Sequence, residues 1–137
     1  MSESLLASIA GFPMFLAFFL LSIALVLVFA RLYSWLTPHD EFGLIRANNA
    51  AAAVAFGGAL IGFALPLSSA ITHSVSFLDC AVWGAIALLV QVLTFVAVRI
   101  IVRQVPERIS QGELASGIFS AACSITIGLV NAASMTF

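Results

Sequence analysis

The chain has 137 residues, of which 63% are hydrophobic and 8% are charged, and its formal net charge is −1 at pH 7. Soluble domains carry roughly 25% charged residues, and a soluble domain of about 150 residues still leaves about 30% of its unfolded surface in water. A water-soluble fold of this length could not hide so much apolar surface, so the composition predicts an integral membrane protein. A nucleic-acid partner is not expected, because the basic footprint that such binding needs is missing.

Four uncharged runs are each long enough to cross the hydrocarbon core, which takes about 20 apolar residues in a helix. We expect transmembrane helices over residues 11–35, 49–72, 77–102 and 114–135. The first run has no basic segment before it and exceeds the roughly 7–15 apolar residues of a signal peptide, so we predict a retained helix. The expected fold is an all-α integral membrane protein with four transmembrane helices.

The arginines predict the orientation of these helices. All five lie in the connection between the first two helices or in the connection between the last two: Arg31, Arg46, Arg99, Arg103 and Arg108. The positive-inside rule places such loops in the cytoplasm. Both termini and the loop between residues 72 and 79 are then expected outside, in the inner (plasma) membrane of a bacterium.

The two halves of the chain resemble each other, which predicts an internal duplication. An offset of 68 positions superposes Arg31 on Arg99 and Pro38 on Pro106, and an offset of 64 superposes the second helix on the fourth. We therefore predict two parallel two-helix repeats, residues 1–72 and 73–137, related by an axis along the membrane normal.

Small residues predict where the helices meet. The second helix carries Gly57 and the spacing Gly58-x-x-x-Gly62, and the fourth has a small residue at every fourth position: Ser116, Ser120, Ser124 and Gly128. Close backbone contact and polar pairs drive helix association in lipid, so we expect these two helices to form a tight inner seam. The first and third helices should face mainly lipid. The alternative is that the small side chains leave room for a solute path.

No Asp, Glu, Lys or Arg lies in the middle of a predicted helix, which removes the usual mark of a proton relay. Gln91 and Thr94 are the polar residues in the middle and inner half of the third helix. Pro66 should kink the second helix and free a carbonyl one turn earlier, which nearby hydroxyls or water could satisfy. Five residues near the outer face could form a polar vestibule, or only make interhelical hydrogen bonds: Pro66, Ser68, Ser69, Asn131 and Ser134.

Polar residues outside the predicted spans have structural interpretations. Asn48 and Asn49 stand where the second helix begins and are expected to cap it. Asp40 and Glu41 lack the spacing of a metal site, so a solvated loop is expected there. The sequence predicts no catalytic, cofactor-binding or metal-binding residue, and neither an enzymatic activity nor a cofactor is expected.

Three segments of the chain resemble a known family. They read LTPHDEFGLIRANNAAAAVAFGGALIGFALPLSSAI, WGAIALLVQVLTFVAVRIIV and GLVNAASMTF. Together they resemble the YjfL-like inner-membrane proteins, which are classified as domain of unknown function 350. The resemblance spans nearly the whole chain and implies a bacterial inner membrane, four helices and two copies of a two-helix unit. It carries no established activity.

Two functions stay open at this level. The small-residue seam and the polar outer end favour a homo-oligomeric pore or transport component, which would need several copies because a bundle of four helices encloses little space. The alternative is an accessory or scaffold subunit that binds a second membrane protein. Short loops and packing motifs suit both.

Overall fold

The computed structural model describes residues 2–37 and 40–135, and these residues form seven helices and no strand. The helices are α1 (Ser2–Ala10), α2 (Phe12–Leu36), α3 (Glu41–Arg46), α4 (Ala50–His73), α5 (Phe77–Ile101), α6 (Val105–Ser110) and α7 (Leu114–Ser134). Four stretches are long and apolar enough to cross a membrane, namely α1 together with α2, then α4, α5 and α7. The predicted all-α fold with four membrane-spanning helices is therefore confirmed.

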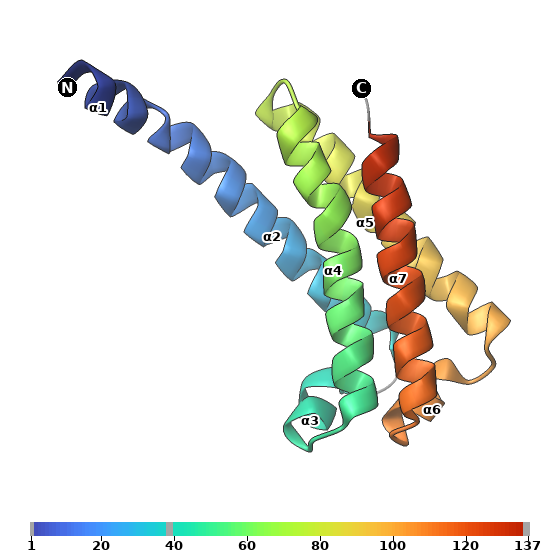
Figure 1. Cartoon of the computed structure of the whole chain (residues 1–137). Helices are drawn as coiled ribbons and strands as arrows, with labels where there is room; N and C mark the ends of the chain where they lie inside the picture. Colours follow the sequence, from blue (N-terminus) through green and yellow to red (C-terminus); the bar gives the residue numbers. More distant parts are fainter. Residues whose placement is uncertain (1, 38–39, 136–137) are drawn as a thin grey trace.

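α4, α5 and α7 form a packed bundle, and α2 lies partly apart from it (Figure 1). α4 and α7 lie side by side, run in the same direction and share the largest contact of the molecule, while α5 runs back and packs against both (Figure 1). α2 touches the bundle near its C-terminal end and leans away from it toward α1 (Figure 1). The start of α1, the α4–α5 turn and the end of α7 lie at one end of the molecule, and α3 and α6 lie at the other.

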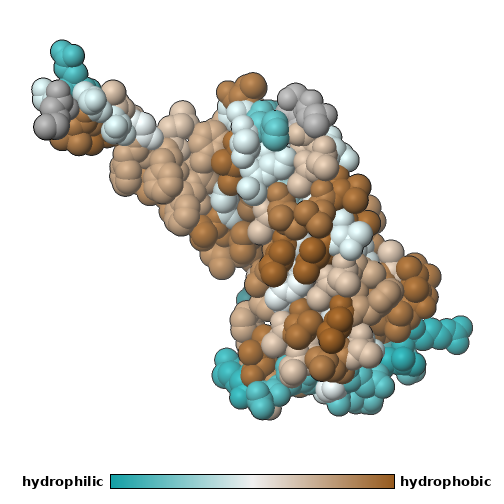
Figure 2. Space-filling model, viewed as in Figure 1, coloured by the Kyte–Doolittle hydropathy of each residue, from teal (hydrophilic) through white to brown (hydrophobic). Residues whose placement is uncertain are grey.

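The surface has the pattern that a bilayer requires. Hydrophilic residues gather at the end that carries α3 and α6 and at the tips of the opposite end, and hydrophobic residues cover the region between them (Figure 2). Lipid cannot hydrogen-bond exposed polar groups, so a spanning protein keeps them at the two interfaces. The ends of the bundle therefore correspond to the two membrane surfaces.

The structure adds a helix before the first predicted span. α1 occupies the segment ahead of residue 11, and α2 begins just after Gly11 with Pro13 in its first turn. Proline has no N–H, so Pro13 cannot donate to the carbonyl of Ile9, four residues earlier, as a continuous helix would require. The helical path is consequently interrupted at Gly11, and the predicted boundary marks the start of α2 only.

Each arginine-bearing connection contains a six-residue helix, α3 or α6, which apolar runs do not predict. Both helices are followed by a residue with positive φ, Asn48 at 67° and Gly112 at 84°. The N–H groups of that residue and of the next one bond to carbonyls of the last helical turn, which is the Schellman motif. Asn48 thus ends α3, and Asn49 alone caps α4 by accepting the Ala52 N–H at 3.0 Å.

The core does not follow the predicted division into two inner and two outer helices. α2 buries only Phe29 and Tyr33, as expected for a helix facing lipid. α5 leaves most of its length uncovered, but one of its faces is buried and includes Gln91, Thr94 and Val98. Three helices, α4, α5 and α7, therefore form the packed centre, because α5 supplies small and polar side chains as well as apolar ones.

Candidate functional site

α4 and α7 meet with their backbones in direct contact. A Cβ atom on Gly58 would lie 2.5 Å from the Cα atom of Ala121, and a Cβ on Gly128 would lie 2.9 Å from the Cα atom of Gly62. Carbon atoms do not approach this closely, so only glycine fits at these positions. The serine stripe predicted on α7 belongs to the same packed region, since Ser116, Ser120 and Ser124 are all buried.

The small residues of α4 and α7 could serve helix packing or leave room for a solute path. The close contact between the two helices favours packing within one copy of the chain. A contact that has no space for a Cβ atom at Gly58, Gly62 or Gly128 has no space for a solute either. The seam between α4 and α7 is therefore a packing interface.

Gly57 lies outside that interface, although it was predicted together with its neighbours. Within the described part of the chain, no atom comes within 4 Å of a Cβ built on Gly57 other than those of its own helix backbone and adjoining residues. The same face of α4 carries Ala53, Ile61, Ala64 and Ser68, all of them exposed. This outward face (the outer α4 face), whose residues are small except for Ile61, can meet another helix.

Gln91 completes the backbone hydrogen bonding of α4. Pro66 has no N–H, so the carbonyl of Gly62, four residues earlier, lacks its usual helical donor. The side-chain Nε2 of Gln91 donates to that carbonyl at 3.0 Å and to the carbonyl of Ser124 on α7 at 3.1 Å. The freed carbonyl was expected to turn to nearby hydroxyls or water, and the structure shows that an amide from α5 satisfies it instead.

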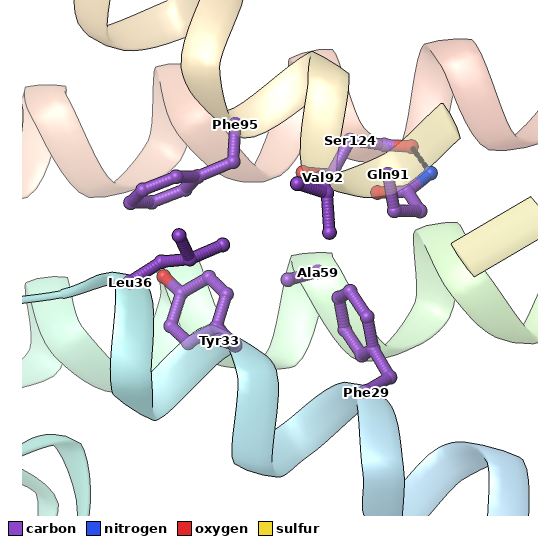
Figure 3. A pocket seen from close by; sticks show the side chains of 8 residues that line it. All are labelled: Phe29, Tyr33, Leu36, Ala59, Gln91, Val92, Phe95 and Ser124. Carbon is purple, nitrogen blue, oxygen red and sulfur yellow. Dashed lines mark hydrogen bonds between the residues drawn. The ribbon is translucent and has the colours of Figure 1, made fainter. Parts of the chain in front are cut away.

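A small cavity lies beside Gln91. The side-chain Oε1 atom of Gln91 is buried and has no hydrogen-bond partner among the described residues. The cavity is lined by side chains from four helices, as Figure 3 shows: Phe29, Tyr33, Leu36, Ala59, Gln91, Val92, Phe95 and Ser124. The centre of a water molecule has about 10 Å³ available there, which is room for about one water. The cavity suits a structural water and not an organic solute.

Thr94 differs from Gln91 although the sequence groups them. Its hydroxyl donates to the carbonyl of Val90 on its own helix at 2.9 Å. Such a bond satisfies the hydroxyl without linking two helices. Gln91 is therefore the polar residue that joins α4, α5 and α7.

The residues of the predicted vestibule have different surroundings. Pro66 is fully buried, Ser69 and Asn131 are half-buried, and Ser68 and Ser134 are exposed. The Ser69 hydroxyl donates to the carbonyl of Ala132 at 3.0 Å and so links α4 to α7, whereas the Ser134 hydroxyl bonds within its own helix. These contacts are those of helix packing, and a shared vestibule stays a prediction.

The prediction of a solvated loop is wrong for Glu41. This side chain is 1% exposed and accepts hydrogen bonds from the hydroxyls of Thr37 and Ser34, the latter at 2.8 Å. A buried carboxylate is tolerated only when it is hydrogen-bonded, and the two hydroxyls at the end of α2 meet that need. Glu41 thereby fastens α3 to α2, and no motif in the sequence predicts this contact.

Asn49 ties the two arginine-bearing connections together. Its side-chain Nδ2 donates to the carbonyls of Ile109 and Ser110 at the end of α6, at 3.1 and 3.2 Å. One amide thus caps α4 and holds α6 against it. Among the described residues, no group of three or more His, Cys, Asp or Glu side chains is placed to hold a metal ion.

Helices of membrane length, a glycine-packed pair and a buried amide at their junction define a small multipass helical membrane protein. The family model for the Domain of Unknown Function (DUF350) matches residues 7–135. The chain belongs to this family, and the resemblance proposed from its sequence is confirmed.

Two relatives agree with this assignment. The chain is 42% identical over 123 residues to the UPF0719 inner membrane protein YjfL of Escherichia coli strain K12 and to the protein of that name in Escherichia coli O157:H7. The match covers 90% of this chain and 93% of each relative. No solved structure matches the chain. Relatives named as inner membrane proteins, together with the four apolar helices, fit a multipass protein of the inner membrane.

Proposed function

We propose that the protein is the membrane-spanning part of a homo-oligomeric pore or transport assembly without enzymatic activity, in which any path runs between copies. The observation that carries this proposal is the contrast between two adjacent glycines. Gly58 is in backbone contact with α7, so one copy is closed along its seam, whereas Gly57 faces outward with open space around it. A path through the assembly would then need several chains.

Two uncovered surfaces support association in the membrane. The first is the outer α4 face, whose small residues allow the close helix approach that stabilises contacts in lipid. The second is the N-terminal half of α2, which stands apart from the bundle (Figure 1). A groove between this half and the end of α4 is lined mainly by exposed aromatic and aliphatic side chains, among them Met14, Phe15 and Ile71. Another helix can fill this groove.

The same surfaces suit the second candidate function, an accessory or scaffold subunit. A lone helix that leans away from its bundle offers apolar surface to a different membrane protein as readily as to a copy of itself. The uncovered half of α2 is the observation that favours this alternative.

We further propose that the end carrying α3 and α6 faces the cytoplasm and that the chain consists of two parallel repeats. The helix boundaries support the repeats: α3 and α6 begin 64 positions apart, as do α4 and α7, and α2 and α5 have 25 residues each. The offset of 68 does not match these boundaries, since α2 and α5 begin 65 positions apart. Pro38, on which that offset partly depends, lies outside the described residues.

The adjacent glycines give a matched pair of variants. Gly57→Leu adds a side chain to the outer α4 face without touching the bundle, so it should leave thermal stability unchanged and prevent assembly. Gly58→Leu collides with α7 and should destabilise each copy. We would measure the mass of the complex in nanodiscs, thermal unfolding, and ion or solute flux in liposomes.

Each outcome of this experiment bears on the proposal. The proposal is supported if the wild type is oligomeric and gives flux, and if a stably folded Gly57→Leu variant loses both the oligomer and the flux. A monomeric wild type, or assembly and flux that persist in Gly57→Leu, overturns it. Absence of flux together with stable recovery of a second membrane protein supports the scaffold function in its place.

A further inference from the structure

A hollow opens at the membrane surface where α2 ends and α3 begins. The hollow is open on one side, and the centre of a water molecule has about 530 Å³ available within it. Six of its lining residues matter for its chemistry: Leu27, Ala30, Arg31, Trp35, Asp40 and Phe42. Sites of roughly 300–1,000 Å³ are typical of small-molecule ligands, so the hollow is large enough for a lipid head group and the upper part of its chains.

The lining of the hollow changes from apolar to charged toward the end of the molecule. Leu27 lies one helical turn deeper than Arg31, which is about 6 Å along the helix axis. Trp35 and Leu36 come one turn later, and Asp40 stands just before α3. A phospholipid has the same order, with apolar chains in the core and a charged head group at the interface.

The charged groups of the hollow lack partners of their own. No hydrogen bond or ion pair joins Arg31 to another of the described residues, and Asp40 makes no side-chain cap on α3 although it occupies the N-cap position. A guanidinium at the edge of the hydrocarbon core is costly without an anionic partner. Arginine presents five donors in a planar fork that matches phosphate oxygens.

The balance of charge indicates which head group fits. Among the described residues that line the hollow, the charged side chains are the guanidinium of Arg31 and the carboxylate of Asp40. A purely anionic head group would satisfy Arg31 and be repelled by Asp40. A head group with a phosphate and an ammonium satisfies both signs of charge.

Two aromatic side chains flank the hollow. Trp35 is 84% exposed, although it is among the largest apolar side chains. Phe42 is 49% exposed, and its ring is held by an edge contact with Phe56 at 5.5 Å. Trp and other aromatic residues concentrate where lipid head groups meet hydrocarbon, so their exposure places the hollow at that level.

We propose that this hollow binds one phospholipid whose head group carries both a phosphate and a primary ammonium, with Arg31 on the phosphate and Asp40 on the ammonium. The inference goes beyond the proposed assembly, since a single copy contains the whole site. It assigns Arg31 a role distinct from that of Arg99, whose guanidinium bonds to the carbonyl of Leu36 and stacks over Phe95.

The experiment is retention of lipid by the purified full-length protein, measured by native mass spectrometry. The probes are phosphatidylethanolamine, phosphatidylglycerol and phosphatidylcholine at equal concentrations. Phosphatidylethanolamine should be retained best. Arg31→Gln should reduce its retention about tenfold, the effect of one charge-assisted contact. Asp40→Asn should abolish the preference over phosphatidylcholine, whose quaternary amine cannot donate a hydrogen bond.

Arg103→Gln is the matched control, because Arg103 is exposed in the other arginine-bearing connection and does not line the hollow. It should leave retention unchanged. Equal retention of the three lipids by the wild type overturns the proposal, as does a preference for phosphatidylglycerol. An Arg31→Gln variant that keeps the helical circular dichroism and the lipid preference of the wild type also overturns it.

Discussion

At the scale of single residues, the structure shows how one irregularity in a membrane helix is compensated by a distant side chain. Pro66 removes a donor from α4, and the carbonyl it leaves at Gly62 lies in the backbone contact between α4 and Gly128 of α7. The missing donor is replaced by the side-chain amide of Gln91 on α5. Its two N–H groups bond to carbonyls on both neighbouring helices, α4 and α7. Pro66 and Gln91 therefore act together in the hydrogen bonding of α4.

This pairing predicts a coupling between the two residues. Gln91→Leu leaves the Gly62 carbonyl without a donor in an apolar setting and should lower the free energy of unfolding by about 1–2 kcal/mol. Pro66→Ala restores the backbone N–H, so the same Gln91 substitution should cost about 1 kcal/mol less in that background. Unfolding in mixed micelles of the four proteins in this cycle measures the difference.

Thr94 provides the control for the cycle. Thr94→Val removes a hydroxyl from the same face of α5, but that hydroxyl bonds to its own helix. Its cost should be equal with proline or alanine at position 66. If Gln91→Leu also costs the same in both backgrounds, the Gly62 carbonyl does not depend on Gln91.

At the scale of elements, the two arginine-bearing connections are built alike. Each has a six-residue helix, a residue with positive φ and then a long helix, yet the residue with positive φ is Asn48 in one and Gly112 in the other. Asparagine and glycine are the residues that adopt this conformation at the lowest cost. The backbone geometry after the short helix is therefore common to both connections, whereas before it Gln104 has a positive φ of 62° and Asp40 is extended.

The positive φ angles predict the effect of alanine at these two positions. Gly112→Ala should destabilise the protein by about 1–2 kcal/mol, the cost of a left-handed conformation for a residue with a Cβ atom. Among the described residues, no atom beyond the two chain neighbours lies within 4 Å of a Cβ built on Gly112, so the cost comes from the backbone. Asn48→Gly should be neutral or slightly stabilising. Thermal unfolding of both variants, with Gln111→Ala as the control at negative φ, checks this.

The sequence predicts those parts of the fold that depend on nearby residues. Apolar runs define α2, α4, α5 and α7, and the glycine spacing identifies the α4–α7 contact. The link from Gln91 to Gly62 spans 29 positions, and no local pattern indicates which carbonyl a buried amide will reach. Gly57 and Gly58 are alike in sequence, and only the direction of the neighbouring helix decides which one is packed. The sequence predicts a solvated loop at Glu41, because nothing near it indicates that hydroxyl groups at the end of another helix will bind its carboxylate.

At the scale of the whole molecule, the proposed orientation places the α3–α6 end in the cytoplasm and both termini outside. The positive-inside rule carries the argument, since all five arginines belong to the two connections at the α3–α6 end or to the helix ends next to them. The hydrophilic surface of that end, seen in Figure 2, agrees with a membrane boundary there but not with a particular side. Cysteine labelling separates the two orientations.

Val75 and Gln111 are suited to this measurement, because Val75 is 93% exposed in the turn between α4 and α5 and Gln111 is exposed at the opposite end. In a background with Cys80→Ala and Cys123→Ala, Val75→Cys should react with an impermeant maleimide in intact cells. Gln111→Cys should react only after the membrane is permeabilised. The reverse pattern would place the arginines outside, and it would also move the lipid hollow at Arg31 to the outer leaflet, since both features belong to the same end of the bundle.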